Sequence, residues 1–120
     1  MIDYRKIVEG LQDTNVFQLL TELGGEPIDK GAFILSKTIC HNHDTSGASY
    51  KLYYYKNSHM FMCYSECAAM SIFKMLKNYY EARNITYDWY QDILNVIISC
   101  APSQTVEGFT AKPYESIKDR

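Results

Sequence analysis

Residues 40–67 read CHNHDTSGASYKLYYYKNSHMFMCYSEC, and this stretch decides how the chain folds. It begins with C-x2-H, continues for nineteen residues, and ends with C-x3-C. Two close donor pairs separated by about one β-hairpin are typical of a zinc ribbon, because zinc prefers a tetrahedron of sulfur and imidazole ligands. The spacing predicts one zinc ion bound by Cys40, His43, Cys63 and Cys67. Four protein ligands leave no open position, so we expect a structural zinc.

Alternatives stay open for both ligand types. The cysteines could form disulfides or lie as plain buried thiols, and His41 or His59 could replace His43 as the fourth ligand. Cys100 lies 33 residues beyond Cys67, and we expect it to be a thiol outside the site. The N-terminal residues MIDYRKIVEG have no signal-peptide apolar core, which predicts a cytoplasmic protein whose thiols stay reduced.

The length and charge of the chain limit the classes of protein to which it can belong. A chain of 120 residues with 47% hydrophobic residues suits one small domain, and a bound metal would add folding free energy. No apolar run approaches the ~20 residues of a membrane span, so no membrane partner is expected. The formal net charge is −2, but residues 33–80 hold five lysines against two acidic residues. The positive charge therefore lies in the segment of the predicted zinc ligands, where it either attracts an anionic partner or is ordinary surface charge.

Periodicity and turn residues predict an α+β fold, a zinc ribbon with a small antiparallel β-sheet flanked by helices. The helices are expected at 3–10, from Asp13 or Thr14 to 23, at 68–82, and from a Thr86 cap to about 97. The strands are expected at 31–39, 50–56 and 59–63. The predicted units are an N-terminal helical segment (1–30), the zinc-ribbon domain (31–82), a C-terminal helix (83–100) and a linker or tail (101–120).

Several motifs together resemble a known family. In chain order they are LLTELG (19–24), CHNH (40–43), SYKL (49–52), FMCYSEC (61–67) and SIFKML (71–76). With these, residues 13–80 resemble the zinc-binding domain, or CHC2-type zinc finger, of bacterial and phage DNA primases. The chain departs from the family in its C-x3-C spacing, in having His41 in place of a common proline, and in lacking glycines around the second ligand pair. These departures indicate a divergent member, of a phage or mobile element.

The resemblance implies a domain that binds single-stranded DNA template for RNA primer synthesis in DNA replication. It also implies a primase catalytic domain or a replicative helicase as partner. The family's catalytic Toprim domain, with its magnesium-binding carboxylates, has no counterpart in this sequence, so no catalytic residue is predicted here. A stand-alone zinc-ribbon adaptor for protein partners is the alternative. A zinc hydrolase is disfavoured, because it would need an open coordination position and a nearby general base.

The strand at 50–56 carries the candidate DNA-binding residues. The family's S-[FY]-x-[VL] pattern assigns Tyr50 and Leu52 to the core, and alternation then turns Lys51, Tyr53 and Tyr55 outward. Exposed tyrosines beside lysines can stack on bases and neutralise phosphates. The alternative is that these tyrosines pack under a flanking helix. Weaker candidates for DNA contact are Lys56, Phe61 and Tyr64.

Overall fold

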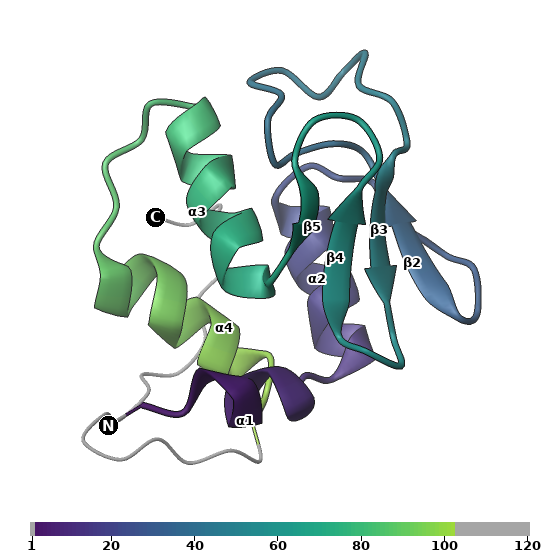
Figure 1. The fold of residues 1–120 in the computed structure, drawn as a ribbon. Coiled ribbons are helices and arrows are strands. Elements are labelled where there is room, and N and C mark those ends of the chain that lie inside the picture. The colour runs from purple at the N-terminus through teal and green to yellow at the C-terminus, as the bar shows by residue number, and fades with distance from the viewer. Residues whose placement is uncertain (1, 103–120) are drawn as a thin grey trace.

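The computed structural model of this protein describes residues 2–102, which form an α+β fold as expected (Figure 1). Two helices lead into five strands, and three helical segments follow. The helical segments are α1 (Tyr4–Glu9), α2 (Asp13–Glu22), α3 (Ile72–Ala82), the π-helical η1 (Trp89–Leu94) and α4 (Asn95–Ser99). The strands are β1 (Ile28–Asp29), β2 (Phe33–Ser36), β3 (Leu52–Tyr55), β4 (Met60–Cys63) and β5 (Ala68–Met70).

The five strands form one antiparallel sheet in the order β1-β2-β3-β4-β5. Each strand pairs with the next along the chain, and the connections are short except for the one from β2 to β3, which spans residues 37–51. In the central hairpin Leu52 pairs with Cys63, and Tyr55 pairs with Met60. This register places one end of the hairpin beside the second cysteine pair and the other at the turn around His59.

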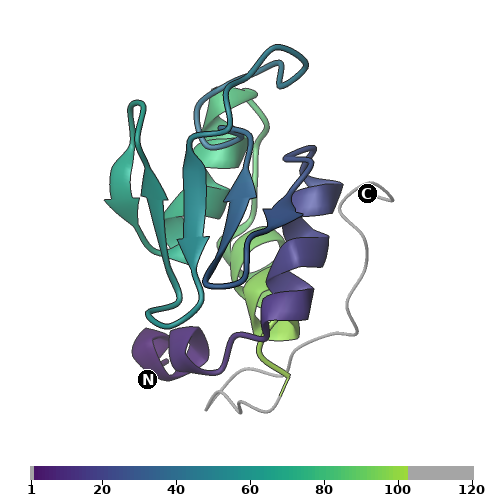
Figure 2. The same cartoon turned by 90° about the vertical axis from the view of Figure 1, so that its right-hand side faces the viewer.

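Helices cover one face of the sheet. Helix α2 lies behind the sheet in Figure 1 and beside it in Figure 2, and α3 contacts β4 and β5. The buried strand residues Leu52, Tyr54 and Phe61 belong to the same core as the helix residues. Leu19, Leu20, Met75 and Leu76 are among the fully buried side chains that the helices supply. Among the described residues no helix is both long and apolar enough to cross a membrane.

Two glycines after α2 end the helix and join it to β2. Gly24 adopts φ +86°, a conformation that L side chains rarely take, and so ends the helix. Gly25 lies so close to β2 that an added Cβ would be 2.2 Å from the Ser36 hydroxyl oxygen. The Gly25 carbonyl accepts hydrogen bonds from the Ser36 hydroxyl and the Lys37 amide. The end of α2 is thereby joined to the strand that leads to Cys40.

The helix predicted at 68–82 is wrong in its first turn. Ala68–Met70 forms the edge strand β5, and α3 begins only at Ile72, where the Ser71 side chain accepts a hydrogen bond from the Lys74 amide. Pairing with β4 overrides the helix propensity of the two alanines. The short strand β1 was not expected either, because Pro27 and Asp29 are typical of a loop.

The other helix boundaries differ slightly from expectation. Asp13 is the first residue of α2 rather than its cap, and Gln12 at the cap position makes no side-chain cap hydrogen bond. The last helical region begins at Trp89, where Asp88, not Thr86, accepts the capping hydrogen bond from the Gln91 amide. Helix α3 ends at Ala82 as expected, and Asn84 just beyond it has φ +54°.

Candidate metal centre and aromatic sheet face

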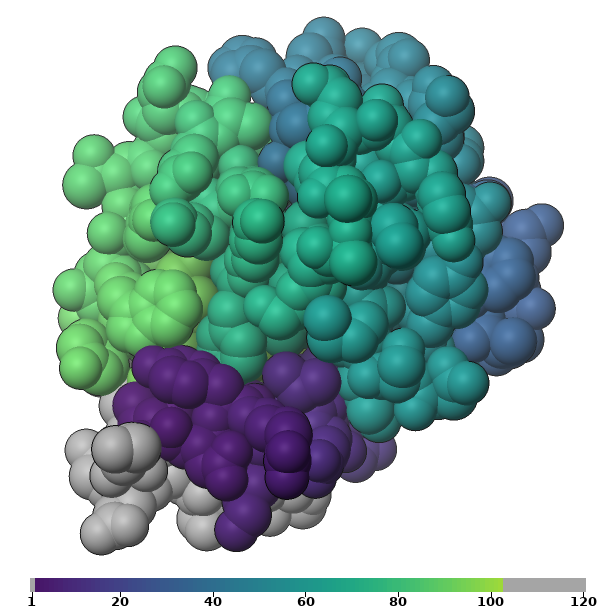
Figure 3. All heavy atoms as spheres, in the orientation of Figure 1, coloured from purple at the N-terminus to yellow at the C-terminus, as the bar shows by residue number. Residues whose placement is uncertain are grey.

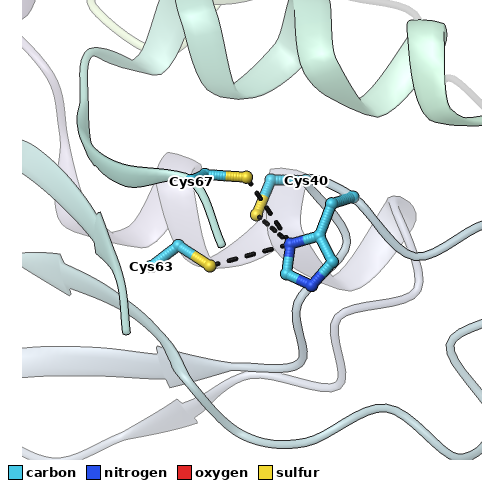
Figure 4. Close-up of side chains that lie close together, drawn as sticks. Cys40, Cys63 and Cys67 are labelled. Carbon is cyan, nitrogen blue, oxygen red and sulfur yellow. Dashed lines mark hydrogen bonds between the residues drawn. The ribbon is translucent and has the colours of Figure 1, made fainter. Parts of the chain in front are cut away.

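Four side chains converge where the two donor pairs meet: Cys40, His41, Cys63 and Cys67. Their ligand atoms all lie within 4.8 Å of one another. The His41 Nδ1 atom is 3.6 Å from Cys40 Sγ, 3.7 Å from Cys63 Sγ and 3.5 Å from Cys67 Sγ (Figure 4). This group could hold one metal ion.

These distances can be compared with those of a metal-bound tetrahedron. Metal–sulfur bonds of ~2.3 Å and a metal–nitrogen bond of ~2.0 Å, the lengths found for zinc, separate sulfur and nitrogen by about 3.5 Å. The three distances from the imidazole nitrogen are within a few tenths of an ångström of that separation. The thiols of Cys40 and Cys63 are buried, and the His41 side chain is only 15% exposed. The four residues therefore fit a closed, four-ligand site.

His43 is not part of this group, which corrects the C-x2-H prediction. The turn at 39–41 is closed by hydrogen bonds from the His41 and Asn42 amides to the Thr38 carbonyl oxygen. This turn places two adjacent residues, Cys40 and His41, toward the second cysteine pair, while His43 lies exposed in the following loop. No spacing rule favours adjacent ligands. The sequence did place a histidine next to Cys40, and His41 was one of the alternative ligands.

His59, the other alternative ligand, lies away from the centre. It occupies the β3–β4 turn with φ +59°, and its Nδ1 atom is 3.0 Å from the Tyr54 hydroxyl. The hairpin register puts that turn at the opposite end of β4 from Cys63. His59 is thus a partner for the buried Tyr54 and not a ligand candidate.

The second ligand pair lies in a turn whose backbone favours a thiolate. Burial raises the pKa of the Cys63 thiol, but the backbone N–H groups of Cys67, Glu66 and Ser65 donate to its sulfur, and the net pKa is lowered. At Cys40, burial and then the neighbouring Cys67 and Cys63 raise the pKa. Three crowded thiols cannot all ionise without a compensating positive charge, which a divalent metal ion would supply.

Helix α3 braces the first ligand pair. Arg83, the residue that follows α3, donates from Nη1 to the Ile39 carbonyl oxygen at 3.0 Å and to the Tyr79 carbonyl oxygen at 3.1 Å. The guanidinium lies 3.9 Å from the centre of the Tyr79 ring. This arrangement holds the residue before Cys40 against the helix, so the turn is anchored from outside the sheet.

Cys100 lies outside the metal group, in the core between α4 and the start of α2. Its Sγ atom is 3.8 Å from the Asn15 carbonyl oxygen, and burial raises the pKa of its thiol to about 12. We therefore expect Cys100→Ser to leave the metal content unchanged and to cost about 1–3 kcal/mol of folding free energy, because it buries a hydroxyl in place of a thiol. Native mass spectrometry and thermal unfolding measure the two effects. Loss of metal from this variant would show that Cys100 is a ligand.

Aromatic rings gather on the sheet face that the helices leave open. Phe33, Tyr53, Tyr55 and Tyr64 form this group, which we call the tyrosine face. Tyr53 is central, with ring centroids 5.0 Å from Phe33, 5.9 Å from Tyr55 and 5.0 Å from Tyr64. Tyr64 is 57% exposed, and Figure 3 shows the teal side chains of β3 and β4 at the molecular surface. No described helix covers this face.

The tyrosine face is uncharged. The Tyr55 and Tyr64 hydroxyl oxygens are 2.7 Å apart, and this hydrogen bond raises the pKa of Tyr55 to about 12. Lys51 is exposed just before β3. Lys56, by contrast, donates to Asp29 at 2.8 and 2.9 Å, and Lys37 pairs with Glu26. Acidic residues outside 33–80 thus offset part of the positive charge that the sequence suggested.

One predicted contact residue lies on the wrong face. Phe61 is 1% exposed and packs against Tyr54 with ring centroids 5.0 Å apart, inside the core. Alternation along β4 directs it inward together with Cys63. A base on the open face could not reach Phe61, so it is removed from the candidate surface.

A shallow recess of about 480 Å³ lies where α1, α3 and η1 meet the start of β4. The rings of Tyr4, Phe73 and Trp89 line it, and Met60 borders it from β4. Phe73 and Trp89 stack with centroids 6.1 Å apart, and Tyr4 meets the Phe73 ring edge-on at 5.1 Å. The recess is mostly apolar, and no sequence pattern had predicted it.

Comparison with known proteins finds similarity to a prophage protein. The SPbeta prophage-derived uncharacterized protein YorJ of Bacillus subtilis (strain 168) is 39% identical over 67 residues. The matched stretch covers 54% of this chain but only 17% of YorJ, so the chain corresponds to a small part of that relative. No protein-family model matches the chain, and no solved structure matches it.

Proposed function

We propose that this chain is a primase-type zinc-binding domain that binds single-stranded DNA template for RNA primer synthesis. The observation that carries this proposal is the tyrosine face. Its rings lie on the open side of the sheet. Strand β4 of the same sheet ends at Cys63, the first residue of the second cysteine pair. The similarity to a prophage-derived protein supports a phage-type origin. We infer the reaction, RNA primer synthesis, from the resemblance of the sequence motifs to those of primases.

Zinc is the metal that the donor set favours. Three thiolates and one imidazole in a closed tetrahedral arrangement suit zinc, whereas magnesium and calcium prefer oxygen ligands. The role of zinc here is structural, since all four positions are filled by the protein. It would join the turn after β2 to the turn after β4 and so hold the central hairpin in place.

The tyrosine face suits nucleobases that are not paired. Stacking on an aromatic ring contributes roughly 1–3 kcal/mol per base and does not depend on base identity. The hydrogen bond with Tyr64 raises the pKa of Tyr55, so the Tyr55 phenol stays neutral at physiological pH and does not repel phosphates. Lys51 lies at the start of the same strand and can contact the backbone. Because Lys37 and Lys56 are paired with carboxylates, we expect weak binding with few phosphate contacts.

Primer synthesis itself needs residues from elsewhere. Nucleotide transfer requires carboxylates that hold magnesium ions, and the described residues include no such group beyond the cysteine and histidine cluster. In the proposed role, a primase catalytic domain supplies them, and a replicative helicase is a second partner. The domain would act in the cytoplasm, where the template is copied.

A protein-interaction adaptor is the second candidate function. The observation in its favour is the apolar recess beside Trp89, which borders the exposed Met60. Apolar recesses lined by aromatic residues are common at protein interfaces. An adaptor would need no DNA contact, so a DNA-binding measurement separates the two functions.

The tyrosine face can be tested by substitution. We expect Tyr53→Ala and Tyr55→Ala each to weaken binding of a short single-stranded oligonucleotide by about 5- to 100-fold, the equivalent of one lost stacking contact. Lys51→Ala should reduce the slope of log affinity against log salt by ~0.7 if it neutralises one phosphate. Fluorescence anisotropy at several salt concentrations measures both effects.

Matched controls exist on other elements. Tyr90→Ala removes a ring that is 56% exposed on η1, and Lys74→Ala removes an exposed charge on α3. Both should bind the oligonucleotide like the wild type. Equal affinity for all variants, with zinc still bound, would reject the tyrosine face and favour the adaptor.

A further inference from the structure

The two ring nitrogens of His41 face different groups. Nδ1 faces the three sulfurs at 3.5–3.7 Å, while Nε2 is 3.1 Å from the Glu66 Oε2 atom. A neutral imidazole carries one N–H, and an ionised carboxylate can only accept hydrogen bonds. The proton therefore belongs on Nε2, where Glu66 accepts it, and the lone pair of Nδ1 is left for a metal.

We propose that Glu66 is a positioning residue that fixes His41 for metal binding through Nδ1. The proposal rests on the metal centre and not on DNA binding. A metal-bound histidine usually donates its other N–H to a carboxylate, carbonyl or water, which fixes the tautomer and strengthens the ligand. Here the carboxylate belongs to Glu66, between the two cysteines of the second ligand pair. The histidine is His41, which belongs to the first ligand pair.

The unusual C-x3-C spacing accounts for this contact. Three residues separate Cys63 from Cys67, and Glu66 is the last of them. Its side chain is 71% exposed, whereas that of His41 is 15% exposed, so the carboxylate reaches the ring from the solvent side. The pair links the two ligand turns across 25 residues of sequence without a covalent bond. The contact needs both departures from the primase pattern: the histidine at position 41 and the longer spacing between Cys63 and Cys67.

Zinc affinity tests the proposal most directly. Competition with a chromophoric chelator should show Glu66→Ala binding zinc ~10- to 100-fold more weakly than the wild type, the usual cost of losing such a partner. Glu66→Gln should lose less, because its amide oxygen still accepts from Nε2–H. Asp44→Asn is the matched control. It neutralises an exposed carboxylate near the first ligand pair. That carboxylate accepts a hydrogen bond from the Ser46 amide, whereas the Glu66 carboxylate contacts His41.

The histidine tautomer supplies a readout that a general loss of stability would not move. In the zinc-loaded wild type, nitrogen NMR of His41 should show a metal-bound Nδ1 and a protonated Nε2 whose hydrogen exchanges slowly with water. In Glu66→Ala the Nε2 hydrogen should exchange faster while Nδ1 stays bound. Circular dichroism at saturating zinc checks that the variant is folded.

Three results would overturn the proposal. One is a Glu66→Ala affinity equal to that of the wild type. Another is an equal loss in Glu66→Ala and Asp44→Asn, which would indicate a general effect of charge. The third is zinc bound through Nε2. A protein that binds zinc in this way but not DNA would reject the proposed function alone.

Discussion

Cys63→Ser is expected to abolish tight zinc binding and to unfold the hairpin region. The Cys63 sulfur accepts three backbone hydrogen bonds and lies 2% exposed at the end of β4, so no other residue can take its place. Zinc binding contributes ~10 kcal/mol or more to the folding of small zinc peptides, because the site does not exist in the unfolded chain. This chain has its own core, so we expect a smaller loss, though still one of several kcal/mol.

Native mass spectrometry should show one zinc on the wild type and none on Cys63→Ser. The midpoint temperature of thermal unfolding should be much lower for the variant. Removing zinc from the wild type with a chelator should reproduce the same loss of stability. Cys100→Ser is the matched control, since it changes a cysteine that is equally buried but lies outside the site. A variant lacking Cys63 that still holds zinc tightly would contradict the four-residue site.

His41→Ala should weaken metal binding far more than His43→Ala. The loss should exceed the ~10- to 100-fold that outer-shell substitutions cost, because a direct ligand is removed. His43 is exposed and two residues away, so His43→Ala should leave the affinity unchanged. Cobalt substitution gives a second measurement: the absorption spectrum of a tetrahedral site with three sulfurs and one nitrogen should change only in His41→Ala.

These two variants form their own control, since each removes one imidazole from the same loop. The reverse outcome, a large loss in His43→Ala alone, would mean that the C-x2-H spacing is correct and that the turn at 39–41 rearranges around the metal. Equal and small losses would mean that three thiols and a solvent molecule bind the metal. Neither result would alter the role of the cysteines.

Much of the fold could be predicted from local sequence. The double glycine at 24–25 ends α2 because only glycine readily takes the conformation needed there. Alternation along 52–55 correctly placed Leu52 inside and Tyr53 and Tyr55 on the other face. Tyr50, which was assigned to the core with Leu52, is instead exposed, because β3 begins only at Leu52. Local sequence failed where pairing decided the outcome. Ala68 and Ala69 favour a helix in isolation, yet they form β5 because β4 offers an open edge.

The candidate DNA-binding surface shows the same division. Alternation predicted that Tyr53 and Tyr55 lie together, but not that Phe33 and Tyr64 would join them from other parts of the chain. It also could not show that the charges of Lys37 and Lys56 are offset by Glu26 and Asp29. Ion pairs between distant residues depend on how β1 folds back against β2, and that strand had no sequence signal.

The sequence by itself determined the three candidate thiol ligands, because cysteines in close pairs on either side of a hairpin have few other structural uses. It also determined the α+β class, through the periods of its apolar residues. Only the tertiary structure decided which histidine lies together with the three thiols. That choice depends on the direction of one imidazole ring, which is set by the turn at 39–41 and by Glu66 on the opposite turn. Such a contact forms only after the hairpin has brought the two turns together, so no local pattern in the sequence could reveal it.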